Sequence, residues 1–64
     1  MWKTIFVSNN HKEAKNIENR LINEGFLVKI KGFDEGDGEF LYEITVLEYE
    51  AKDAHGFLNE NGII

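Results

Sequence analysis

The sequence contains no cysteine among its 64 residues, so it can form neither a disulfide framework nor a zinc site with thiolate ligands. A domain of this size buries only about 60% of the surface that its unfolded chain exposes. Small domains therefore often add a disulfide, a metal or self-association to the packing of their core. Without cysteine, the means that remain to this chain are core packing and self-association.

Basic residues are also scarce, because 7 lysines and arginines stand against 12 aspartates and glutamates, for a net charge of −5. Nucleic acid and anionic lipid surfaces would repel such a chain as a whole. Lys29 and Lys31 share one predicted strand, but two lysines do not make a basic stripe. We therefore expect neither a nucleic acid nor a membrane as partner.

Long apolar runs are missing as well. The opening MWKTIFVSNN holds one lysine and a short apolar run, too brief for a signal peptide or a membrane span. We expect a cytoplasmic protein with a single domain over residues 1–64.

The residues that are present predict alternating strands and helices. A β-branched and aromatic segment predicts a strand over about 2–7. The following apolar positions recur at helical spacing and predict a helix from Asn10, which with Glu13 forms a start like a capping box, to Gly25, a left-handed end. Period-2 alternation predicts strands over about 26–31 and 40–47, and a last helix runs from about 48 to 61.

This order predicts an α+β fold, a βαββα two-layer sandwich. The right-handed crossover and a hairpin return place the third strand in the middle of a three-stranded antiparallel sheet of order 1-3-2, with both helices on one face. The end of strand 1, the start of helix 1, the 32–39 loop and the end of helix 2 then meet at one pole.

The stretch GFDEGDGEF, residues 32–40, tests whether that pole holds an ion. An EF-hand loop fails in both registers, because the ligand positions fall on glycine, phenylalanine or isoleucine. A phosphate cradle fails because four carboxylates would repel the anion. We interpret the stretch as a turn in which Gly36 and Gly38 supply positive φ and Asp34 and Asp37 form turns. A weak divalent-ion contact and a partner-binding loop remain as alternatives, and no metal or cofactor is predicted.

Few residues suit catalysis. Ser8, Asn10 and His11 lie close in sequence, but the same letters form an ordinary strand-to-helix turn, and His55 is expected to shield the sheet from the second helix. We therefore predict no catalytic residue and no enzyme. An alternative function is a domain that binds a small ligand or a divalent metal at the pole of residues 8–11 and the 32–39 loop, through Asn9, Asn10, His11, Asp34 and Asp37.

The sheet face away from the helices is the stronger candidate. With Ile5 and Val7 directed inward, apolar side chains gather on the uncovered face, and such a surface indicates an interface. The predicted interface residues are Trp2, Phe6, Leu27 and Leu41. The opposite parity of strand 1, which leaves Trp2 and Phe6 in the core, stays open, and both alternatives leave Leu27 and Leu41 outside. Strand 1 also offers a free edge.

Three segments, MWKTIFVSNN, INEGFLVKI and YEITVLEYEAKDAHGFL, together resemble a small, functionally uncharacterised bacterial family of signal-transducing proteins common in Firmicutes. Its layout is similar to a shortened nitrogen-regulatory PII subunit. The resemblance covers nearly the whole chain and rests on apolar and small residues. Where that family opens its last helix with Val-Pro-Glu-Ser, this chain has Val46-Leu47-Glu48-Tyr49. The resemblance implies a ferredoxin-like fold and a regulatory role, with residues 32–39 in the place of the partner-binding PII loop.

These observations together predict a non-enzymatic regulatory or protein-interaction module. We expect a homo-oligomer that associates through the sheet, together with a protein partner that the sequence does not identify.

Overall fold

The apolar runs and helical repeats fold into three strands and two helices, and the computed structural model describes residues 1–64. The elements in chain order are β1 (Trp2–Ser8), α1 (His11–Asn23), β2 (Val28–Gly36), β3 (Glu39–Leu47), the 3-10 turn η1 (Glu48–Glu50) and α2 (Ala51–Glu60). This is the predicted βαββα order and the ferredoxin-like type of layout.

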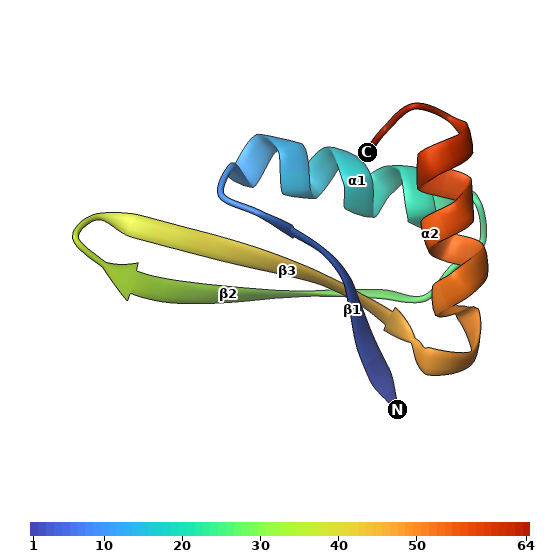
Figure 1. Cartoon of the computed structure of the whole chain (residues 1–64), viewed down its shortest axis with the longest axis horizontal. Coiled ribbons are helices and arrows are strands. Elements are labelled where there is room, and N and C mark those ends of the chain that lie inside the picture. Colours follow the sequence, from blue (N-terminus) through green and yellow to red (C-terminus); the bar gives the residue numbers. More distant parts are fainter.

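The sheet is antiparallel with the strand order β1-β3-β2, as predicted, and both helices pack against it. Figure 1 shows α1 lying along the sheet and α2 crossing steeply at the end of the molecule opposite the β2–β3 turn. The fully buried side chains come from both helices and from the central strand: Ala14, Ile17, Leu21, Ile44, Val46, Ala54 and Leu58. The core therefore lies between the helices and β3.

The ends of α1 are those that the sequence predicts. The Asn10 side chain accepts a hydrogen bond from the Glu13 N–H at 3.0 Å, which satisfies one of the free amides of the first turn. At the other end Gly25 has a φ of +98°, and the Phe26 N–H donates to the Leu21 carbonyl at 3.0 Å. This closure is a Schellman motif, which requires the left-handed residue.

The β2–β3 hairpin is longer than predicted. Residues 32–36, expected as loop, belong to β2, and Asp34 pairs with Phe40. The turn itself is Asp37-Gly38, both with positive φ, and Asp34 Oδ1 accepts the Gly36 N–H at 2.9 Å. The predicted roles of these residues as turn formers are confirmed, but pairing across the strands shortened the loop. The hairpin tip therefore projects past the helices (Figure 1).

β1 contains a β-bulge. Both predicted alternatives assumed one regular alternation of side chains along the whole strand, so neither describes it in full. Thr4 pairs with Thr45 and Phe6 pairs with Ile44, so Ile5 is an extra residue without a partner. An extra residue reverses the alternation of the side chains that follow it. Ile5 and Phe6 both pack against the core, whereas Trp2, before the bulge, lies outside with its pairing partner Leu47.

The second helix begins differently from the prediction, because η1 occupies residues 48–50 and α2 starts only at Ala51. The predicted stop is present, since Gly62 has a φ of +67°. His55 is exposed and does not shield the sheet, because Ala51, Ala54 and Leu58 already cover the buried side of α2. Neither helix combines the length and the apolar character that crossing a bilayer requires.

Candidate functional site

No helix covers the sheet face turned away from α1 and α2, which we call the open face. Ile44 and Val46 of β3 are buried against the helices, so the residues that alternate with them along the strand face the other way. The residues of β1 and β2 that pair with those belong to the same face. It consists of Trp2, Thr4, Val7, Leu27, Lys29, Lys31, Phe33, Leu41, Glu43, Thr45 and Leu47. Three of the four predicted interface residues are on it, and Phe6 is not, because the bulge turned Phe6 toward the core.

Large apolar side chains lie at the two ends of the open face. At one end Trp2 pairs with Leu47. Leu27, which directly precedes β2, lies at the same end and is 60% exposed. At the other end Phe33, 41% exposed, pairs with Leu41. Burying each of these groups fully is worth about 1.5–3 kcal/mol, so a partner that covers both ends of the face would gain stability from them.

Polar groups join the two ends. Thr4 Oγ1 donates to Glu43 Oε1 at 3.0 Å, and Thr45 Oγ1 donates to the Lys29 carbonyl at 2.7 Å. The Lys29 ammonium lies 4.9 Å from the centre of the Trp2 ring, a cation–π contact. Thr45 is only 4% exposed although it points away from the helices, so its neighbours already form an ordered layer over the middle of the face.

The polar residues predicted as a ligand pole are used for local structure at the start of α1. The Ser8 hydroxyl accepts the Asn10 N–H at 3.0 Å and donates to Glu13 Oε1 at 2.5 Å. The His11 ring packs edge-on against Tyr42, with the ring centres 5.3 Å apart. Ser8 and His11 therefore take part in separate interactions, those of a helix cap and of an aromatic contact. Asn9 is exposed and makes no side-chain hydrogen bond.

The two aspartates of the predicted pole lie on the hairpin, and the structure does not gather them with the other members. Asp34 sits in β2 and bonds within the turn, and Asp37 forms the tip that projects from the domain (Figure 1). The end of α2, expected at this pole, lies at the other end of the molecule. Nowhere do three His, Asp or Glu side chains come together as ligands of one metal ion would.

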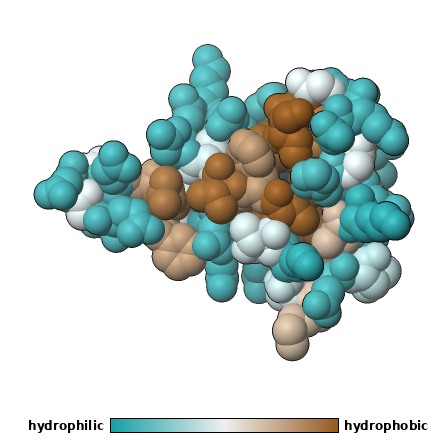
Figure 2. All heavy atoms as spheres, in the orientation of Figure 1, coloured by the Kyte–Doolittle hydropathy of each residue, from teal (hydrophilic) through white to brown (hydrophobic).

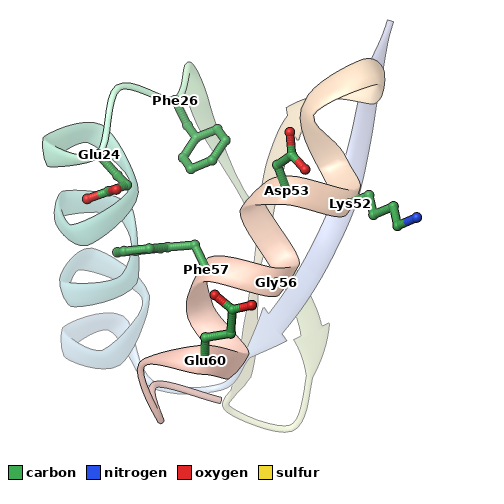
Figure 3. Close-up of a pocket in the computed structure, with 7 residues that line it drawn as sticks. All are labelled: Glu24, Phe26, Lys52, Asp53, Gly56, Phe57 and Glu60. Carbon is green, nitrogen blue, oxygen red and sulfur yellow. The ribbon is translucent and has the colours of Figure 1, made fainter.

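A groove lies between the two helices, and the sequence analysis did not predict it. It has a volume of about 490 Å³ and lies where the end of α1 faces α2. Figure 3 shows the rings of Phe26 and Phe57 in the space between the helices, with Asp53 and Glu60 on the α2 side. Glu24 lies at the end of α1, and its carboxylate is directed away from the rings. No local sequence pattern predicts this groove, because it forms only when the fold brings residues 24–26 next to residues 53–60.

Apolar surface is also visible from the side shown in Figure 2, where a band of apolar atoms runs between the helices and the sheet. The hairpin tip in the same view is hydrophilic. This contrast matches the sequence, since residues 34–39 are acidic or glycine.

The chain matches no protein-family model, and the comparisons with curated proteins and with solved structures found no match. The resemblance to a signal-transducing family therefore stays a prediction based on the three quoted segments.

Proposed function

We propose that this chain is a protein-interaction module without catalytic activity, which associates with a second copy of itself through the open face. The observation that carries the proposal is the exposure of Trp2, Leu27 and Phe33 on a sheet face that no helix covers. A regulatory role in an unnamed pathway is part of the same proposal and rests on the family resemblance.

The charge distribution favours a second copy as the occupant. The open face carries Lys29, Lys31 and Glu43, a net charge of +1, on a chain whose total is −5, which leaves −6 on the remaining surface. Two copies that approach by any other side bring strongly acidic surfaces together. Face-to-face contact turns the acidic surfaces outward and leaves each Glu43 within reach of the partner's lysines at the rim.

The size of the face sets the expected strength. Three strands about 4.8 Å apart and at most nine residues long offer a flat footprint of roughly 400 Å² per copy. Stable protein interfaces bury about 600–1,000 Å² per partner. Side chains that project from the sheet add contact area to this estimate for a flat surface. We therefore expect a dimer of moderate, roughly micromolar, affinity.

Sedimentation equilibrium at about 100 µM tests this proposal, since a dimer with a micromolar dissociation constant is then mostly assembled. Leu27→Asp and Leu41→Asp should each dissociate it while the circular dichroism spectrum stays folded. Ile22→Asp is the matched control, because Ile22 is a comparably exposed apolar residue on α1 and should leave the dimer intact. A parent chain that sediments as a monomer at this concentration would refute the proposal.

A further inference from the structure

The groove between α1 and α2 has a floor of aromatic rings. Phe26 and Phe57 are partly buried against the core, and their ring centres lie 6.4 Å apart with the planes tilted by 47°. Gly56, one residue before Phe57, completes the floor. Ring faces carry partial negative charge, so a floor of this kind attracts a cation that also has flat or apolar surface.

The rim of the groove carries three carboxylates that form no ion pair within the chain. Glu24, Asp53 and Glu60 line it, and the only ion pair in the chain joins Lys15 to Glu18 elsewhere. Lys52 is the one base among the lining residues, and Figure 3 shows its side chain directed away from the rings. The groove is therefore acidic as well as aromatic.

Two of the carboxylates stand at helix ends, and each adds to the negative potential at its own end of the groove. Glu24 is the C-cap of α1 and Glu60 is the last residue of α2, so both stand at the helix termini that carry partial negative charge. A carboxylate at this end is unfavourable for the helix itself. The two C-terminal ends lie at opposite ends of the groove, because the first turn of α2 lines it through Lys52 and Asp53 (Figure 3). A positive group would therefore be held by the side-chain carboxylates rather than by the helix ends.

Gly56 is unexplained by packing within the chain. It is the sixth residue of the ten-residue α2, where glycine is the least favourable residue other than proline. A Cβ built there meets no atom within 4 Å, and its φ is not in the left-handed range. Any side chain at this position would stand in the groove, so glycine keeps the space over the floor open.

We propose that the groove binds an arginine side chain presented by a segment of a partner protein. The guanidinium is planar, stacks on aromatic faces and donates several hydrogen bonds to carboxylates, which matches both floor and rim. The net charge of −5 attracts a basic segment over a longer range. This groove lies on the helix side of the sheet, so the inference stands independently of the association through the open face.

The test uses the whole ¹⁵N-labelled chain and a capped peptide, Gly-Ala-Arg-Arg-Ala-Gly, titrated by amide NMR. Shifts are expected in residues 24–26 and 53–60, and none with the same peptide carrying glutamine for arginine. Asp53→Asn and Glu60→Gln should each weaken binding by about threefold to fivefold. Glu35→Gln on the hairpin tip removes the same charge away from the groove and should leave binding within about twofold.

Gly56→Leu separates loss of the site from loss of the fold. Leucine is a good helix former and has room at this position, so the variant should melt at a higher temperature while its peptide affinity falls at least tenfold.

Undiminished binding by Gly56→Leu, or equal losses in Glu35→Gln and Glu60→Gln, would overturn the proposal in favour of general charge attraction. Agmatine binding as tightly as the peptide would also overturn it, because the occupant would then be a free guanidinium compound.

Discussion

α1 and α2 lie on the same face of the sheet, but only α1 has both ends secured. α1 has a side-chain N-cap at Asn10 and a Schellman closure at Gly25. α2 ends in the same kind of closure, since Gly62 has a positive φ and the Ile63 N–H donates to the Leu58 carbonyl at 2.9 Å. Its start, however, has no side-chain cap, and a glycine lies in its middle. Local sequence therefore specifies both ends of α1 but only the end of α2, whose start depends on the tertiary packing of Ala51, Ala54 and Leu58. A helix held mainly by packing is free to carry unfavourable residues on its outer side.

The largest expected effect tests whether the two helices share one core. Leu21 in α1 and Leu58 in α2 are both fully buried, and replacing either by alanine should cost about 2–5 kcal/mol. A 64-residue domain has only about 3–10 kcal/mol of stability, so both variants should melt far below the parent or be partly unfolded at 25 °C.

Thermal melts followed by circular dichroism measure this effect, and Ile22→Ala is the control because Ile22 is half exposed. A Leu58→Ala variant as stable as the parent would mean that α2 is not part of the core.

A smaller effect distinguishes the starts of the helices. Asn10→Ala removes the bond to the Glu13 N–H and should lower the free energy of unfolding by about 0.5–2 kcal/mol. Glu50→Ala should cause no loss, because Glu50 makes no capping bond and its buried Oε1 lacks a hydrogen-bond partner. Urea unfolding measures both, and an equal loss in the two variants would contradict the contrast between the helices.

The smallest expected effect compares two glycines, whose replacement by alanine should change the free energy of unfolding in opposite directions. Gly25→Ala should lower the free energy of unfolding by about 1 kcal/mol, since its φ of +98° strains any residue with a Cβ. Gly56→Ala should raise it by about 0.5–1 kcal/mol, because a helix interior prefers alanine and the added methyl meets nothing. Urea unfolding measures both changes. A lower free energy of unfolding in both variants would show that Gly56 is required for the fold.

Much of the fold follows from the sequence because its local signals agree with the packing. Asn10 and Gly25 act where the pattern predicts, and the strand order follows from the handedness of the crossover. The Glu13 side chain accepts from the Ser8 hydroxyl and not from the Asn10 N–H, so the predicted capping box is only half formed. The hairpin is longer than predicted because glycines and carboxylates are typical of loops. The pairs Phe33–Leu41 and Asp34–Phe40 override that local preference.

Less of the candidate sites could be predicted. Regular alternation assigns Phe6 to one face for the whole of β1, but the unpaired Ile5 reverses the faces at that point. The pattern of a strand does not show where a bulge falls, because its position depends on how β1 meets β3 and the helices. The groove at Phe26 and Phe57 has the same origin, since its two halves are 31 residues apart in the sequence and only the fold brings them together.

The bulge at Ile5 has a consequence for fibril growth. An edge strand with an even row of free N–H and C=O groups is a template on which further copies can stack into cross-β fibres. Ile5 breaks that row in β1, and residues 3–5 line one hollow together with Ala51, Lys52 and His55 of α2. An incoming strand loses its register at the bulge and meets a helix beside it. At its N-terminal edge this small acidic chain is therefore protected against polymerisation.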